Sequence, residues 1–267
     1  MPTCTEEWVN AADGSKIYEQ SWKPAPETTI KATLVLAHGL GEHISRYTHV
    51  FTVFAQSGIR VRAFDQRGFG QTGKKNGVLG HNEGFAKVME DLKACEDRVR
   101  VEGKPHFLFG HSMGGGIALR YATLHGEGLR GVIASSPLIM SGSSTTVSAP
   151  KYWGIRLLSN VVGSAVVRSP VDADLLTAVP EANQQYKDDP LVHDYVSMCT
   201  ARDIVLNGEN LLRRDYALVK VPILITFGEK DSITRYVPNE VTHVQQPLAR
   251  GNLSFSLKFV NFFFVKS

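Results

Sequence analysis

Short apolar runs alternate with longer, partly polar stretches through the first half of the chain. The runs have the length of strands, and the stretches at residues 45–57 and 84–102 have the length of helices. In the second stretch, apolar side chains recur on one helical face. Because strands that alternate with helices form β-α-β units, we predict a mostly parallel sheet flanked by helices. The predicted strands lie at residues 32–37, 59–64, 106–109 and 131–135.

Two other segments of this half have different patterns. Asp13-Gly14 is a turn signal between strand patterns at residues 8–10 and 16–22, which predicts an antiparallel hairpin at the start. Residues 68–80 are rich in glycine and are predicted to form a loop.

The alternation of strands and helices stops after residue 137, and the next clear strand pattern is at residues 222–228. Pro150 favours the first turn of a helix over about residues 151–167, whose apolar side chains cover a wide arc. We predict one α/β core with a cap inserted over the strand ends, where open α/β sheets bind ligands. The core comprises residues 1–137 and 222–267, and the cap comprises residues 138–221.

The charge of the chain is almost balanced, with 29 Lys and Arg against 26 Asp and Glu among 267 residues. Because the basic residues do not cluster beyond pairs, we expect no nucleic-acid surface. The first residues do not resemble a signal peptide, and no apolar run is long enough to span a bilayer. The cysteines Cys4, Cys95 and Cys199 are odd in number and widely spaced. These features predict a cytoplasmic protein with reduced thiols, and they imply that any membrane contact is peripheral.

A glycine-rich turn with a serine at its centre lies between the strand at 106–109 and a predicted helix at 116–124. In that context the G-x-S-x-G pattern Gly110–Gly114 is typical of a nucleophile elbow, which lifts the serine hydroxyl clear of the sheet. The flanking glycines let the strand and the helix approach each other. The pattern predicts that Ser112 is a nucleophile and that the Met113 N–H, at the start of a helix, faces a developing oxyanion.

Two further stretches follow predicted parallel strands. Gly39 and Gly41 flank Leu40 directly after the first central strand, so that the backbone can approach a ligand there. Esterases of this architecture take their second oxyanion donor from such a loop, and we predict the Leu40 N–H for that role. Asp231 follows the strand at 222–228, where an acidic side chain can orient a histidine and stabilise its cation.

Four motifs occur in sequence along the chain, namely His38–His43, Asp65–Thr72, Gly110–Gly115 and Gly228–Asp231. In this order they resemble the monoacylglycerol lipase family of α/β-hydrolases, which is also grouped under the S33 serine aminopeptidase or hydrolase 4 domain. The resemblance covers about residues 6–234 and includes the cap segment Asp189–Val192. It implies an α/β-hydrolase fold with an inserted cap, and hydrolysis of a monoacylglycerol or similar long-chain ester without a metal or an organic cofactor.

The resemblance also implies site residues and partners. The nucleophile would be Ser112, the acid Asp231, and the oxyanion donors Leu40 and Met113. Family members often attach peripherally to membranes or lipid droplets, so a lipid ester and such a surface are the implied partners.

Other polar residues are given structural roles. Asp65 and Arg67 are predicted to pair near the oxyanion loop. Most remaining histidines lack the spacing of metal ligands, so no metal site is predicted. These histidines are His81, His106, His125 and His193, whereas His43 and His111 belong to the motifs as loop and packing residues.

A nucleophilic serine and an acid of this kind work with a histidine as the third member of a catalytic triad, and here the chain departs from the family pattern. Chain order requires a histidine after Asp231, in a loop that follows the last strand. Residues 251–260 alternate in hydrophobicity as that strand would, but residues 261–267 contain no histidine. His243 is the only histidine after Asp231, and it lies where the family has a helix. His243 is therefore the candidate base, and the alternative is that the base is missing.

The predicted function is that of a serine ester hydrolase, which cleaves monoacylglycerol-like lipids through an acyl-enzyme. Two alternatives remain open. One is another hydrolase of the same fold, such as a short-chain esterase or an aminopeptidase. The other is a catalytically impaired pseudo-hydrolase that binds lipid.

Overall fold

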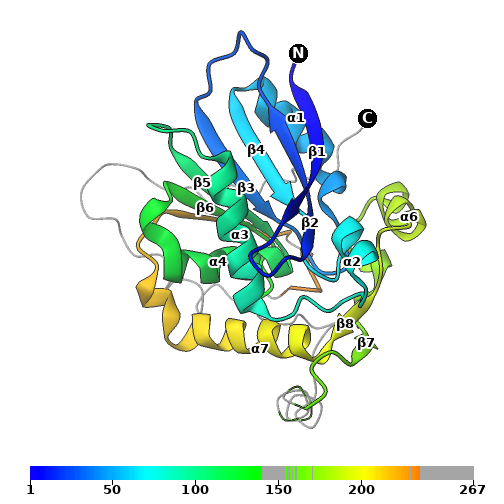
Figure 1. Cartoon of the computed structure of the whole chain (residues 1–267). Helices are drawn as coiled ribbons and strands as arrows, with labels where there is room; N and C mark the ends of the chain where they lie inside the picture. Colours follow the sequence, from blue (N-terminus) through cyan, green and yellow to red (C-terminus); the bar gives the residue numbers. More distant parts are fainter. Residues whose placement is uncertain are drawn as a thin grey trace.

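Seven strands of the described residues form one mostly parallel sheet at the centre of the computed structural model (Figure 1). The structure describes residues 1–139, 161–169, 171–228 and 230–234, together with residues 154, 157 and 159. β1 and β2 form the predicted hairpin, β2 also pairs antiparallel with β4, and the other neighbours are parallel, which confirms the predicted α/β architecture. In spatial order the strands are β1 (Thr3–Asn10), β2 (Lys16–Lys23), β4 (Ile59–Phe64), β3 (Ala32–Ala37), β5 (His106–His111), β6 (Gly131–Ser135) and β9 (Ile223–Thr226).

Helices cover both faces of this sheet (Figure 1). Along β3, Val35 faces the apolar cluster that includes α3 and α4, whereas Leu34 and Leu36 face the cluster that includes α1. All three side chains are at most 2% exposed, which explains why β3 is a continuous apolar run. The helices of this part are η1 (Ile44–Tyr47), α1 (Thr48–Gln56), α2 (Gly70–Asn76), α3 (Phe85–Val99), α4 (Met113–His125) and η2 (Gly126–Gly128).

Between β6 and β9 the chain forms a smaller group of elements beside the sheet. α7 packs against α4, where Leu211 joins Leu119 and Ala134 in an apolar cluster. Ser197 caps α7, because its side-chain oxygen accepts a hydrogen bond of 3.2 Å from the Thr200 N–H. These elements are β7 (Val166–Arg168), η3 (Ala173–Leu175), α6 (Pro180–Asp188), β8 (Tyr195–Ser197), α7 (Met198–Arg213) and η4 (Asp215–Leu218).

The predicted helix over residues 151–167 is wrong at its end. Val166 and Val167 belong to β7, which pairs antiparallel with β8, and residues 161–165 form turns and an irregular link. Valine favours extended backbone because branching at Cβ restricts its side chain in a helix, and here a partner strand is available. Of residues 151–160 the structure describes only 154, 157 and 159.

The segment 68–80, predicted as a loop, contains the short helix α2. The Gln71 N–H in its first turn donates to Asp65 Oδ2 at 2.7 Å, and the Ile44 N–H donates to Asp65 Oδ1 at 2.9 Å. Burial raises the pKa of Asp65 to about 6 against these donors. The predicted ion pair between Asp65 and Arg67 is wrong, because backbone N–H groups satisfy the carboxylate and Arg67 has other partners.

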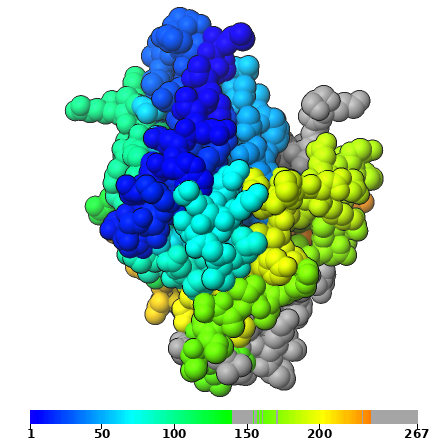
Figure 2. Space-filling view, turned by 45° about the vertical axis from the view of Figure 1, so that its right-hand side comes forward, coloured from blue at the N-terminus to red at the C-terminus, as the bar shows by residue number. Residues whose placement is uncertain are grey.

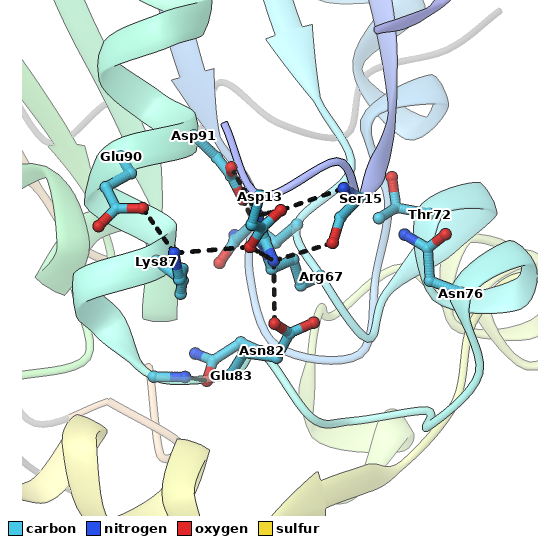
Figure 3. A network of polar contacts seen from close by, with 12 residues as sticks. Asp13, Ser15, Arg67, Thr72, Asn76, Asn82, Glu83, Lys87, Glu90 and Asp91 are labelled. Atoms are coloured by element: carbon cyan, nitrogen blue, oxygen red, sulfur yellow. Dashed lines mark hydrogen bonds and ion pairs between the residues drawn. The ribbon is translucent and has the colours of Figure 1, made fainter. Parts of the chain in front are cut away.

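Arg67 joins three separate parts of the chain (Figure 3). Its Nε donates to Asp91 of α3 at 2.7 Å, and its Nη1 donates to Asp13 of the β1–β2 turn at 2.7 Å and to Glu83 at 2.9 Å. The Arg67 side chain is 2% exposed, and a guanidinium has the five N–H donors that such a set of acceptors requires. Arg67 therefore fixes the opening hairpin to α3 and to the segment that precedes α3.

Candidate active site

Ser112 lies at the apex of a sharp turn between β5 and α4. Its φ of 53° and ψ of −119° are rare for a residue with a side chain and cost conformational energy, which is typical of a functional turn. The Ser112 N–H donates to the Ser135 carbonyl oxygen of β6 at 2.9 Å, and the Ser112 carbonyl accepts the Leu138 N–H at 2.8 Å. The predicted sequence of strand, turn and helix is therefore present around this serine.

Two glycines allow the elements around Ser112 to approach each other. A Cβ at Gly110 would overlap the carbonyl oxygen of Gly114, and a Cβ at Gly114 would overlap the carbonyl oxygen of Ala37. The N-terminus of α4 is thus pressed against the end of β3. Met113 is the first residue of α4 and is 1% exposed. Its N–H is one of those in the first turn of a helix, which have no acceptor within the helix.

The loop after β3 lies beside the serine. A Cβ at Gly39 would lie 3.2 Å from the Ser112 Cβ, which is closer than side chains ordinarily pack. Leu40 follows directly in this loop. The structure therefore brings together three of the predicted segments, which carry Ser112, Met113 and Leu40.

His38 holds the peptide between Gly39 and Leu40. The Gln66 backbone N–H donates to His38 Nε2 at 2.9 Å, so the proton of the neutral ring is on Nδ1, which donates to the Gly39 carbonyl oxygen at 2.8 Å. Burial lowers the pKa of His38 to about 4, which keeps the ring neutral near pH 7. A trans peptide directs its N–H away from its carbonyl, so the Leu40 N–H points away from His38.

The Glu42 carboxylate holds the other side of Gly39. Its Oε1 accepts the Gly39 N–H at 2.6 Å and the Tyr47 hydroxyl at 2.6 Å. Burial acts to raise the pKa of Glu42, but His111, the Tyr47 hydroxyl and the Arg46 cation outweigh it and hold the pKa below its ordinary value. Sequence reasoning missed this role, and the available signal was an acidic residue three positions after a loop glycine, at a spacing that lets a carboxylate reach back to the backbone.

Asp231 lies beyond β9, at the sheet edge where β5 also ends. Its Oδ1 accepts the N–H groups of Ile233 at 3.0 Å and Thr234 at 2.9 Å, and its Oδ2 accepts the Thr234 hydroxyl at 2.6 Å. A carboxylate oxygen can accept two hydrogen bonds, so Oδ2 retains capacity for a donor such as an imidazole N–H. The predicted base His243 and the predicted strand at 251–260 lie outside the described residues.

The fold and the elbow match a known family of hydrolases. A family model described as serine aminopeptidase, S33, matches residues 28–254. The chain belongs to this S33 family of α/β-hydrolases. Within the part of the S33 chain that the structure describes, no group of three or more His, Cys, Asp or Glu side chains is placed to hold a metal ion.

Relatives of this S33 chain include proteins named as lipases. It is 33% identical over 225 residues to an uncharacterized abhydrolase domain-containing protein of Dictyostelium discoideum, and 33% identical over 224 residues to a putative monoglyceride lipase of Schizosaccharomyces pombe. The matches cover 84% and 82% of this chain but 23% and 58% of the two relatives. The S33 chain thus spans less than two thirds of the length of either relative.

A solved structure shows the same likeness. A soluble variant of the monoglyceride lipase of Saccharomyces cerevisiae, in complex with a substrate analog, superposes with a TM-score of 0.76 at 25% identity, over 89% of this chain and 80% of that chain. The α/β-hydrolase fold and the monoacylglycerol lipase family predicted from the motifs are confirmed. Among the described residues of the S33 chain, no helix combines the length and the hydrophobicity needed to cross a bilayer.

Proposed function

We propose that the chain is a serine ester hydrolase that cleaves monoacylglycerol-like lipid esters to fatty acid and glycerol. The observation that carries the proposal is the strained Ser112, which lies at the start of α4 beside the Gly39–Leu40 loop. This arrangement suits an acyl transfer, in which a nucleophile and two backbone donors must meet at one carbonyl group. The names of the fission-yeast and budding-yeast relatives support the lipid substrate.

In the proposed mechanism, Ser112 Oγ attacks the ester carbonyl carbon while a histidine removes its proton. The Leu40 and Met113 N–H groups stabilise the oxyanion of the tetrahedral intermediate. The intermediate collapses and releases glycerol as the histidine returns the proton to the leaving oxygen. Water attacks the resulting acyl-enzyme and releases the fatty acid. Asp231 orients the histidine and stabilises its cation, and His243 is the candidate for that histidine.

The proposed cap, residues 138–221, would bind the acyl chain over a core formed by residues 1–137 and 222–267. Several large apolar side chains of this segment are exposed. Val161 is 83% exposed and Leu157 is 67% exposed. Such side chains suit contact with an acyl chain or with the surface of a membrane or lipid droplet. Among the described residues of this segment, the other large apolar side chains that are exposed are Val162, Val166, Val167, Leu175, Leu176 and Leu218.

A pseudo-hydrolase that binds lipid without turnover is the second candidate. The observation that favours it is that the candidate base His243 follows Asp231 by only 12 positions, where the family has a helix. Without a base, a serine hydroxyl is a weak nucleophile, and the oxyanion donors and substrate binding would retain about 10³–10⁴ of rate enhancement.

The release of fatty acid from a monoacylglycerol by the full chain tests the proposal. We expect release that is lost in Ser112→Ala, and rates across a chain-length series of esters that favour long acyl chains over aminoacyl substrates. Hydrolysis of aminoacyl substrates alone would indicate a peptidase. Lipid binding without release from any ester would instead support the pseudo-hydrolase.

A further inference from the structure

The segment 189–193, after α6, lies directly against the loop that carries Leu40. The His193 N–H donates to the Gly41 carbonyl oxygen at 3.0 Å. Gly41 has a φ of 76°, and a Cβ there would overlap the His193 carbonyl oxygen, so this approach requires glycine. The His193 ring donates to the Gly68 carbonyl oxygen at 3.0 Å. Figure 2 shows the yellow-green part of the chain packed against the cyan part around α2.

A carboxylate of the same segment fixes the far end of the loop. Asp189 Oδ2 lies 2.8 Å from His43 Nε2 and 3.6 Å from Arg46 Nη1, and Asp189 Oδ1 accepts the Leu191 N–H at 3.0 Å. The side chains of His43 and Asp189 are 5% and 20% exposed, so little water competes for these contacts. Asp189 thus contacts one residue directly before η1 and one residue within it.

Arg46 extends this contact to the carboxylate that holds Gly39. Arg46 Nε lies 3.7 Å from Glu42 Oε2, and its guanidinium lies 4.8 Å from the centre of the Tyr186 ring of α6. The other oxygen of Glu42 accepts the Gly39 N–H. A continuous series of side chains therefore connects Asp189 to the peptide that precedes Leu40.

We propose that Asp189 is a positioning residue, which keeps the Gly39–Leu40 loop in its observed position through His43, Arg46 and Glu42. The oxyanion donor on this loop is then in place only while the segment 189–193 is docked. For its effect on catalysis, this inference rests on the proposed function. Because Asp189 does not reach the reacting atoms, its loss lowers kcat by misplacing a donor and leaves substrate binding largely intact.

Hydrogen exchange of the full chain tests the contact independently of activity. In the wild type, local opening of the loop must break the contacts of Asp189. Asp189→Ala removes that cost, so we expect amides in a peptide covering residues 38–46 to exchange about tenfold faster than in the wild type. Asp174→Ala is the matched control, since it removes an exposed ion pair with Lys187 of α6. We expect this control to leave the exchange of residues 38–46 unchanged. Equal exchange in Asp189→Ala, Asp174→Ala and the wild type would overturn the proposal.

A conservative variant separates positioning from a loss of folding. Asp189→Asn keeps an oxygen acceptor for His43 but removes the charge that faces Arg46. We expect folded Asp189→Asn to exchange at a rate between those of the wild type and Asp189→Ala. If Asp189→Ala does not fold, wild-type exchange at residues 38–46 in Asp189→Asn overturns the proposal.

Turnover of a short soluble ester, p-nitrophenyl butyrate, tests the catalytic consequence, with Ser112→Ala as the background. We expect kcat to fall about tenfold in Asp189→Ala with KM within about twofold, because a misplaced oxyanion donor acts on the transition state. A raised KM with unchanged kcat would overturn the positioning role. Absence of Ser112-dependent hydrolysis in the wild type would instead contradict the proposed function. The exchange measurement would then still show whether Asp189 holds the Gly39–Leu40 loop in position.

Discussion

At the residue scale, the loop beside Ser112 depends on a neutral histidine. His38→Ala removes the acceptor of the Gln66 N–H and the donor to the Gly39 carbonyl, and leaves both groups buried. We expect the free energy of unfolding to fall by about 1–3 kcal/mol, the cost of unsatisfied buried groups. We also expect kcat for a short ester to fall about tenfold, because the Gly39–Leu40 peptide is no longer held. Urea unfolding and steady-state kinetics measure the two effects, and an unchanged kcat would contradict the role assigned to His38.

A second histidine, His106, gives a prediction on pH. Burial lowers the pKa of His106 to about 4, and one ring nitrogen lies 2.7 Å from Thr33 Oγ1. Between about pH 6.5 and 4 the unfolded chain binds the proton and the folded chain does not, so this residue makes stability fall as the pH falls. Between pH 7 and 4.5 the unfolding free energy of the wild type should drop by about 2 kcal/mol more than that of His106→Gln. Parallel pH profiles of the two proteins, measured by urea unfolding, would contradict this.

At the element scale, Arg67 connects the opening hairpin, the Glu83 segment and α3. Arg67→Met leaves the buried Asp91 carboxylate without its cation, and we expect the protein to lose about 3–5 kcal/mol of stability. Arg168→Ala, which removes an exposed pair with Asp194, should cost at most about 1 kcal/mol. Chemical denaturation compares the two variants. Similar losses in both would show that the Arg67 contacts do not stabilise the fold.

The elements also show what the sequence could and could not predict. The strands β3 to β6 and the elbow were predicted because apolar run lengths and glycine spacing are local properties. The strand β7 was missed because Val166 and Val167 depend on a partner about 30 positions later along the chain, which no local pattern contains. The partners of Asp65 were missed for the same reason, since they depend on how separate segments meet.

At the scale of the whole molecule, apolar side chains are exposed on the segment inserted between β6 and β9. Replacing Val161 and Val162 by Ser should weaken binding to liposomes severalfold while hydrolysis of a short soluble ester stays unchanged, since both side chains already face water. Val53→Ser is the control, because Val53 is 56% exposed on α1 of the core. Co-sedimentation with liposomes measures the effect. If the double variant and the control bind alike, the inserted segment does not contact the membrane.

The central claim is that Ser112 is an activated nucleophile, and covalent labelling tests it most directly. The full chain is treated with a fluorophosphonate, which reacts with serine nucleophiles, and the labelled peptide is identified by mass spectrometry. We predict one label, on Ser112, with none in Ser112→Ala and slower labelling in His38→Ala, whose oxyanion loop is no longer held. A wild-type chain that remains unlabelled, or that is labelled at another serine, would contradict the account.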